Sequence, residues 1–337
     1  MQNRLYSFGF NAFGQTKKSD DAIVRSPYCH THTSRVLFTS WETTIVIDDE
    51  GVLQFWGFQP PWFSIFKKLC QQKRNIVSIF GDPNTMMGLI DEQYNVSYVT
   101  EASEHLDCMT HVEQAVYCQG QRAILALQQA SGQVEHYDID TLSSHKVDLP
   151  PDSRVTMMSA AHTHVLFLTD SLDVPVLGYG SNRLSQCGID YQQQELKTPT
   201  AIDYFCGLRD ATDVACGPFH SAVILGGDVY TFGWSKDGRL GWGPTRQDDD
   251  DDIISLAVFL DVNDQPLEIN ATKVVCGSAH TLVLDDQGHV WSCGSNAYGQ
   301  LGRTLPADQQ SDAYFRRCSS DKAIDCFAGR WASFILI

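Results

Sequence analysis

The chain has 337 residues, of which 43% are hydrophobic and 19% charged, and its formal net charge is −17. A polyanion of this size is repelled by a phosphate backbone, so we expect no direct nucleic-acid binding and regard a basic protein as the electrostatically favoured partner. No apolar run reaches the roughly 18 residues of a membrane helix, no Cys-x-x-Cys pair occurs, and the first residues lack a signal-peptide pattern, so we expect an intracellular protein without membrane contact, disulfide framework or zinc ribbon.

The chain opens with RLYSFGFNAFGQ (4–15), an apolar strand followed by two glycines and a short polar loop. This stretch aligns position by position with VWSCGSNAYGQ (290–300), the second half of a later unit. The last segment, DCFAGRWASFILI (325–337), has the first half of such a unit and then stops. We therefore predict that the two ends of the chain share one unit and leave no free strand edge.

An aromatic segment, QFWGFQPPWFSIF (54–66), interrupts an early unit where a glycine closure is expected. Its aromatic side chains form either an exposed partner-binding patch, since aromatics dominate interface hot spots, or a loop that folds back and fills space. The residues concerned are Trp56, Phe58, Trp62, Phe63 and Phe66.

Internal repeats organise the rest of the chain. Three copies are clear, at 158–188, 214–241 and 274–302, and they share a small residue or Cys, Gly, two variable positions, His, Ser or Thr, an apolar strand, a glycine turn, a second strand and a closing Leu-Gly or Cys-Gly. Weaker copies align on the His-Ser/Thr position, which predicts seven units of about 40 to 60 residues. The aligned positions are Thr43, Asn84, Arg122, His162, His220, His280 and Ala332.

Each unit has about four short β-rich runs separated by turn residues, without sustained helical periodicity. A unit of this size must pack against its neighbours to bury its faces. We predict an all-β fold, a single seven-bladed β-propeller over residues 1–337, with an acidic loop insertion at about 244–270. A linear solenoid is the alternative, but it needs polar caps that we do not find.

The repeated residues have structural interpretations. We expect His162, His220 and His280 to be buried hydrogen-bonding residues, because the same histidine recurs from unit to unit. Cys216/His220 and Cys276/His280 are four residues apart, which on a strand separates the side chains by roughly 13 Å and excludes a shared metal. The repeated glycines mark tight turns or close backbone approaches. They are Gly217, Gly233, Gly277, Gly294 and Gly299.

Five consecutive aspartates, Asp248, Asp249, Asp250, Asp251 and Asp252, lie in the insertion. Like charges at this density repel one another, so a solvated loop is one interpretation. The other is a docking site for a basic tail, such as a histone tail.

We find no nucleophile elbow, P-loop, His-Glu-x-x-His or dinucleotide-binding glycine motif in its proper strand–turn–helix context. The glycine-rich stretches GYGSNRL and GSNAYG recur as unit closures and are interpreted as turns. We expect a protein without catalytic residues, metal or cofactor.

The motif in CGSAHTLVLDDQGHVWSCGSNAYGQLG (276–302) resembles the regulator of chromosome condensation repeat. The resemblance covers most of the chain, strongly from 158 to 302, and implies a seven-bladed propeller without catalytic chemistry of its own. The founding member is a nucleotide-exchange factor for the GTPase Ran that also binds nucleosomes. This chain differs in its strong acidity and in having no basic run before its first strand, so exchange-factor activity for a Ran-type GTPase is kept as the alternative function.

Within this family, FGFNAFGQ and SRVLFTSWETTIVIDDEG (34–51) resemble members that consist of little but the propeller. That resemblance implies a protein of the nucleus, with the cytoplasm as the alternative or additional location, that acts in chromatin regulation and chromosome segregation. It also implies a protein-interaction scaffold whose partner is a Jumonji-C oxygenase of the lysine-demethylase class.

Overall fold

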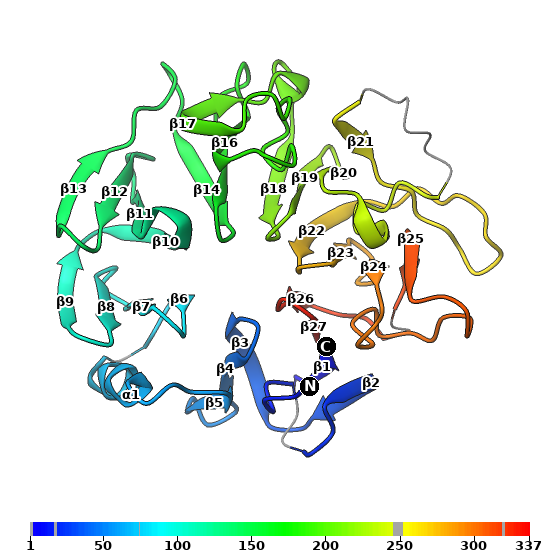
Figure 1. The fold of residues 1–337 in the computed structure, drawn as a ribbon, viewed down its shortest axis with the longest axis horizontal. Coiled ribbons are helices and arrows are strands. Elements are labelled where there is room, and N and C mark those ends of the chain that lie inside the picture. The colour runs from blue at the N-terminus through cyan, green and yellow to red at the C-terminus, as the bar shows by residue number, and fades with distance from the viewer. Residues whose placement is uncertain (1–2, 17–18, 74, 245–251, 319–320) are drawn as a thin grey trace.

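A computed structural model of the protein describes residues 3–16, 19–73, 75–244, 252–318 and 321–337. Seven antiparallel sheets stand around a central axis like the blades of a propeller (Figure 1). The predicted seven-bladed β-propeller is thus confirmed, and we name each blade by its strands. In chain order, from the innermost strand outward, the blades contain the following strands: β3 (Thr33–Thr39), β4 (Thr43–Asp48) and β5 (Leu53–Gly57); β6 (Ser78–Asp82), β7 (Met86–Ile90), β8 (Val96–Thr100) and β9 (Glu104–Met109); β10 (Val112–Cys118), β11 (Ala123–Gln128), β12 (Val134–Asp138) and β13 (Ser143–Lys146); β14 (Val155–Ala160), β15 (His164–Thr169), β16 (Val176–Ser181) and β17 (Glu195–Ala201); β18 (Ala211–Cys216), β19 (His220–Leu225), β20 (Asp228–Gly233) and β21 (Ile254–Leu256); β22 (Ala271–Cys276), β23 (His280–Asp285), β24 (Val290–Ser295) and β25 (Ser311–Arg317).

The seventh blade joins the two ends of the chain. It has the order β26 (Asp325–Ala328), β27 (Ala332–Leu336), β1 (Leu5–Phe10) and β2 (Ile23–His30), and β1 pairs antiparallel with β27 from Leu5↔Leu336 to Gly9↔Ala332. Both ends of the chain accordingly lie in this blade (Figure 1). The prediction that the termini share one unit is confirmed, and the ring closes through backbone hydrogen bonds instead of leaving two strand edges open.

The opening loop repeats its later counterpart at atomic detail. The Asn11 side-chain oxygen accepts the Thr16 amide at 2.9 Å, and that of Asn296 accepts the Leu301 amide at 2.9 Å. Gln15 and Gln300 are both fully buried and each accepts the amide two residues earlier. The Asn-x-x-x-Gln pattern therefore specifies one loop that is used repeatedly, which explains the sequence alignment of 4–15 with 290–300.

One blade departs from the four-stranded pattern. Blade β3–β5 has three strands, and the helix α1 (Phe63–Gln72) follows where a fourth strand is expected. Phe63, Phe66 and Leu69 are buried against Ile45 and Met87, so the helix seals the space between this blade and blade β6–β9. This helix was not predicted from the β-rich pattern of the repeat. Two short 3-10 turns, η1 (Gln119–Gln121) and η2 (Asp203–Phe205), lie in other connections, and a third, η3 (Lys236–Gly238), follows β20.

The core consists of apolar clusters between neighbouring blades, such as the one in which Phe167 and Leu177 pack on Leu125. Within each blade, neighbouring strands are antiparallel, so the first and third connections of a blade lie at one end of its strands and the second connection at the other. We call the end with the first and third connections the upper face. It is the face that carries the candidate site.

Candidate functional site

Three histidines, each the first residue of the second strand of its blade, link neighbouring blades. His164 Nε2 lies 2.8 Å from Ser221 Oγ, His220 Nε2 lies 2.8 Å from Thr281 Oγ1, and His280 Nε2 lies 2.9 Å from Ser333 Oγ. In each case the hydroxyl also donates to a carbonyl in the blade that carries the histidine, as Ser221 does to Gln186 O at 2.7 Å. We call each such contact an inter-blade link.

The inter-blade links fix the protonation of these histidines. Since the hydroxyl proton goes to a carbonyl, the hydroxyl oxygen is an acceptor and the histidine donates its Nε2–H. Nδ1 is buried without a hydrogen-bond partner in the described structure. Burial lowers the pKa of His164 and of His280 to about 3 and that of His220 well below its ordinary value. These rings are neutral at physiological pH and serve the fold.

Glycines lie three residues before His220 and His280, too close to neighbouring atoms to carry a side chain, whereas Ala161 has the same position before His164. A Cβ on Gly277 would lie 2.2 Å from His280 Cε1, and one on Gly217 would lie 2.4 Å from the Gly277 carbonyl oxygen. Gly233 and Gly294, both at φ +105°, approach His220 Cα and His280 Cα, and Gly299, at φ +81°, approaches Arg25 Cα. These distances give the repeated glycines a steric reason.

The linking histidine of blade β14–β17 is His164, not His162 as the sequence alignment has it. The sequence Ala161-His162-Thr163-His164 corresponds to Gly217-Pro218-Phe219-His220, because Ala161 N donates to His164 O just as Gly217 N donates to His220 O. Two histidines two residues apart made the alignment ambiguous. His162 therefore occupies one of the two variable positions of the Gly-x-x-His motif.

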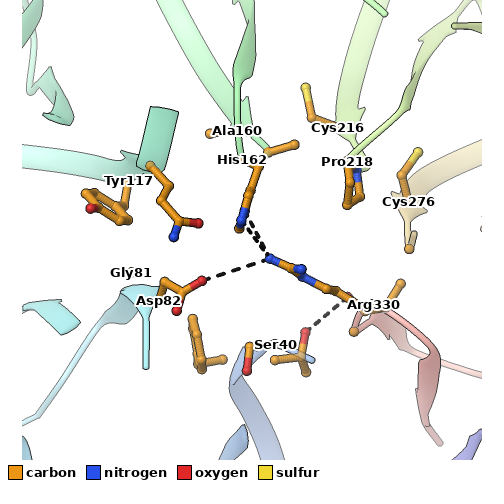
Figure 2. A pocket seen from close by; sticks show the side chains of 17 residues that line it. Ser40, Gly81, Asp82, Tyr117, Ala160, His162, Cys216, Pro218, Cys276 and Arg330 are labelled. Atoms are coloured by element: carbon orange, nitrogen blue, oxygen red, sulfur yellow. Dashed lines mark hydrogen bonds and ion pairs between the residues drawn. The ribbon is translucent and has the colours of Figure 1, made fainter. Parts of the chain in front are cut away.

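His162 points into the central channel, where it meets Arg330 (Figure 2). Arg330 Nη2 lies 3.0 Å from His162 Nδ1, 3.1 Å from His162 Nε2 and 3.9 Å from Asp82 Oδ2. Burial, together with the nearby Arg330 charge, lowers the pKa of His162. The guanidinium therefore donates to a neutral imidazole, and its only carboxylate partner in the described structure is Asp82 at the edge of ion-pair distance.

These side chains line a channel cavity of about 200 Å³ that also contains Cys216 and Cys276. Cys216 Sγ donates to Ser159 O at 3.1 Å, and burial raises its pKa to about 12. Burial also raises the pKa of Cys276 well above its ordinary value. Both thiols are protonated at neutral pH, which argues against their use as nucleophiles or metal ligands.

A wider cavity of about 710 Å³ opens above the channel on the upper face and shares His162, Pro218 and Arg330 with it. We call it the channel-mouth basin. It collects residues from five blades, and its charged and aromatic lining residues are Trp41, Arg183, Phe219, Trp234, Lys236, Asp237, Arg239, Arg330 and Trp331.

The aromatic side chains of the channel-mouth basin are exposed and hold cations against their rings. Trp41 and Phe219 are each 40% exposed and Trp234 is 37% exposed. The Arg239 guanidinium lies 4.8 Å from the Trp234 ring centroid, Lys236 Nζ lies 5.4 Å from the same ring, and the Arg330 guanidinium lies 5.9 Å from the Trp41 ring. Large aromatics exposed in a concave surface are typical of binding sites.

An aromatic row continues this surface across blade β26–β2. Trp41 packs on Trp331 at 5.2 Å, Trp331 on Phe10 at 5.9 Å, Phe10 on Phe13 at 6.0 Å, and Phe13 on Phe58 at 6.1 Å, all measured between ring centroids. Phe13 is 41% and Phe58 40% exposed. The channel-mouth basin is therefore one end of a longer apolar surface.

The sequence-derived candidates fall in three places. Phe58 joins the aromatic row, and Trp56 is half-buried, with its ring stacked on His30 at 4.5 Å. Trp62 and Phe63 lie in the core around α1, with exposed fractions of 9% and 1%, where they supply packing and no accessible surface. Of the five aspartates, Asp252 is exposed and Asp248–Asp251 lie outside the described residues.

Most residues of the channel-mouth basin were not identified from the sequence. A usable signal exists: in blade after blade the two variable positions of Gly-x-x-His face the channel mouth, and at the last unit these positions are Arg330-Trp331. Because these two positions differ from unit to unit, they are not found by looking for the residues that recur in every repeat. The same differences give each blade its own side chains at the channel mouth.

The described residues offer neither a metal site nor a membrane-spanning helix. They contain no group of three or more His, Cys, Asp and Glu side chains placed to hold a metal ion. None of their helices has both the length and the apolar character needed to cross a bilayer.

Comparison with known proteins agrees with the resemblance noted in the sequence. Residues 175–224, 226–284 and 271–300 match the regulator of chromosome condensation (RCC1) repeat. The chain is 31% identical over 159 residues to the secretion-regulating guanine nucleotide exchange factor of Mus musculus, covering 47% of this chain and 30% of that protein. It is 27% identical over 220 residues to RCC1 domain-containing protein 1 of Mus musculus, covering 56% of each.

The fold has a solved counterpart of nearly equal extent. The crystal structure of human WBSCR16 superposes with a TM-score of 0.74 at 16% identity, over 100% of this chain and 99% of that one. The sequence matches span only about a third to a half of the two curated relatives. The chain is therefore a seven-bladed β-propeller in which residues 175–224, 226–284 and 271–300 match regulator of chromosome condensation repeats.

Proposed function

We propose that this propeller is a non-catalytic protein-interaction scaffold that holds its partner on the upper face. The observation that carries the proposal is the continuous aromatic surface from Phe58 to the channel-mouth basin, where Trp41, Phe219 and Trp234 are each more than a third exposed. Exposing this many large aromatics to water is costly unless a partner covers them. The protonated channel thiols give no support to an enzymatic alternative.

For the partner we propose a Jumonji-C oxygenase of the lysine-demethylase class, met in the nucleus and in the context of chromatin. This rests on the sequence resemblance to propeller-only members of the family and is supported by the match to RCC1 domain-containing protein 1 over 56% of the chain. The propeller would restrain or present the oxygenase while its blades supply rigidity. The acidic run Asp248–Asp252 remains a proposed contact for basic histone tails.

The experiment is affinity purification of the tagged full chain with mass spectrometry, alongside a Trp41→Ser/Trp234→Ser variant. The matched control is Tyr94→Ser, an exposed aromatic in the connection between β7 and β8, which lies at the end opposite to the upper face. We expect a Jumonji-C oxygenase with the unaltered chain and with the control, and its loss with the double variant. Recovery that is equal in all three would reject the surface, and the absence of any such oxygenase would reject the partner.

Guanine nucleotide exchange on a Ran-type GTPase is the second candidate, because one relative is named a guanine nucleotide exchange factor and is 31% identical over 159 residues. A nucleotide-release assay with the purified GTPase separates the two functions. Acceleration at catalytic amounts of the propeller would favour exchange, whereas unchanged release favours the scaffold.

A further inference from the structure

The channel-mouth basin carries a charge opposite to that of the molecule as a whole. The chain has 24 basic and 41 acidic residues. Among the charged side chains that line the basin, however, Arg183, Lys236, Arg239 and Arg330 face a single carboxylate, that of Asp237. A positive hollow in an otherwise acidic protein selects the charge of whatever enters it.

One of these cations is committed to the fold. Arg239 is 2% exposed, its Nε donates to Lys236 O at 2.7 Å and its Nη1 donates to Ser278 O at 2.6 Å. It fixes the η3 turn against blade β22–β25, and its buried positive charge lies beneath the surface of the channel-mouth basin. The remaining three cations are accessible: Arg183 and Lys236 are exposed at the rim, and Arg330 lies at the floor.

The aromatic rings around these cations indicate the sign of the ligand. The two faces a cationic ligand would use, those of Trp234 and Trp41, are already approached by the protein's own Lys236, Arg239 and Arg330. A lysine- or arginine-rich ligand would therefore meet like charge at these rings. A carboxylate would instead find guanidinium and ammonium groups held in place by stacking, which lowers the entropy lost on binding.

The shape of the site indicates a linear ligand. The channel-mouth basin measures about 710 Å³ and narrows into the channel cavity of about 200 Å³ through His162, Pro218 and Arg330. This volume accepts a few consecutive side chains of an extended segment and excludes a flat folded surface. A long nucleic acid would continue beyond the basin over a surface whose overall charge repels phosphate.

We propose that the channel-mouth basin binds an acidic linear segment of a protein partner. Its carboxylates pair with Arg183, Lys236 and Arg330, and an apolar side chain packs against Trp41 or Trp234. This inference rests on the proposed scaffold function and names the chemistry that the scaffold recognises. It is distinct from the proposed contact of Asp248–Asp252 with basic tails, which would use opposite charge.

The test is fluorescence anisotropy with a labelled peptide of Asp and Glu residues around a central Leu-Trp pair. A peptide with Asn and Gln in place of the acids, and a single-stranded oligonucleotide of similar length, serve as comparison probes. The variant is Arg183→Ser/Lys236→Ser in the full chain. Its control is Lys197→Ser/Arg209→Ser, which removes the same charge from exposed positions outside the basin.

We expect the acidic peptide to bind, the amide peptide to bind at least tenfold more weakly, and the rim variant to lose about tenfold in affinity, since each charge-assisted contact contributes roughly a factor of three or more. The control should stay within about twofold of the unaltered chain. We expect the melting temperatures of both variants to equal that of the unaltered chain, because the substituted side chains are exposed. Equal melting temperatures exclude a folding defect as the cause of weaker binding. Arg330→Gln provides a second reading from the floor of the basin, with weakening again expected.

Three results would overturn the inference: equal binding of the acidic and amide peptides, equal loss in the rim variant and its control, or tighter binding of the oligonucleotide than of the acidic peptide. Each leaves the scaffold proposal standing if Trp41→Ser/Trp234→Ser still releases the purified partner. If the acidic peptide binds as expected but Trp41→Ser/Trp234→Ser does not release the purified partner, the basin does bind acidic segments and the scaffold proposal fails.

Discussion

The inter-blade links show how a single side chain can hold a ring of blades together. His164, His220 and His280 each donate from a fully buried Nε2–H to a hydroxyl of the next blade. His162 lies two residues before His164 and makes a different contact, with Arg330. The pair His162 and His164 therefore offers a matched comparison of a channel residue with a link.

We expect His164→Ala to lower the free energy of unfolding by about 2–4 kcal/mol, because it removes a buried hydrogen bond and leaves a cavity. His162→Ala should cost less than about 1 kcal/mol, since its ring is half-buried and its contact is shared with solvent. Urea denaturation of both variants measures the difference. A larger loss for His162→Ala would contradict the assignment of the link to His164.

Stability should fall on mild acidification. A histidine whose pKa drops to about 3 on folding binds its proton only in the unfolded chain between pH 6.5 and 3, so the unfolded state gains protons and stability is lost as pH falls through this window. Each link contributes a slope of about 1.4 kcal/mol per pH unit. Denaturation curves from pH 7 to 5 should therefore be less pH-dependent for His164→Asn than for the unaltered chain, and parallel pH profiles would rule out this linkage.

At the scale of elements, β1 is the strand that closes the ring of blades. Leu5 and Phe8 are fully buried, and β1 lies between β2 and β27 in the closing blade. Without β1 the sheet edge of β27 is open and β2 has no partner strand.

Deletion of residues 1–15 should therefore lower the melting temperature of the whole protein, because every blade depends on ring closure. The control is Phe13→Ser, which changes an exposed side chain within the same stretch and should leave the melting temperature unchanged. Differential scanning calorimetry checks both. A truncated chain that keeps its melting temperature would mean that the ring of blades is stable without the pairing of β1 with β27.

The aromatic segment 54–66 separates into a buried and an exposed part. Phe66→Ala should destabilise by about 3–5 kcal/mol, because the ring is fully buried under α1. Phe58→Ser should leave stability nearly unchanged and reduce retention of the partner, because Phe58 is 40% exposed in the aromatic row. Thermal unfolding together with pull-down separates the two effects, and equal destabilisation by both changes would contradict this division.

The sequence carried the repeat, the number of units and the closure by the termini, because the Asn-x-x-x-Gln loop and the Gly-x-x-His motif recur. It did not reveal α1, although Phe63, Phe66, Leu69 and Cys70 follow helical spacing after Pro60-Pro61. The helix has only ten residues, so its helical spacing of apolar residues was too short to outweigh the four-stranded pattern of the repeat. The predicted alignment of the fourth unit was wrong by two residues, because His162 and His164 both fit the histidine position of the motif.

At the scale of the whole molecule, net charge and local charge disagree. The value of −17 favours a basic partner, yet the channel-mouth basin gathers four cations and one carboxylate. The Gly-x-x-His positions mark part of this surface in the sequence, but its charge becomes visible only when the ring of blades brings together residues from Trp41 to Trp331. The fold can therefore be predicted from the repeat, whereas the charge of the channel-mouth basin requires the three-dimensional structure.

Hydrogen–deuterium exchange of the full chain, with and without the co-purified partner, shows which face of the propeller binds that partner. If the upper face is the docking surface, protection should concentrate in the first and third connections of the blades, around residues 40–42, 218–219, 234–239 and 330–331. Protection confined to the opposite connections, such as 91–95 and 285–289, would place the partner on the other face and exclude the upper face as the docking surface.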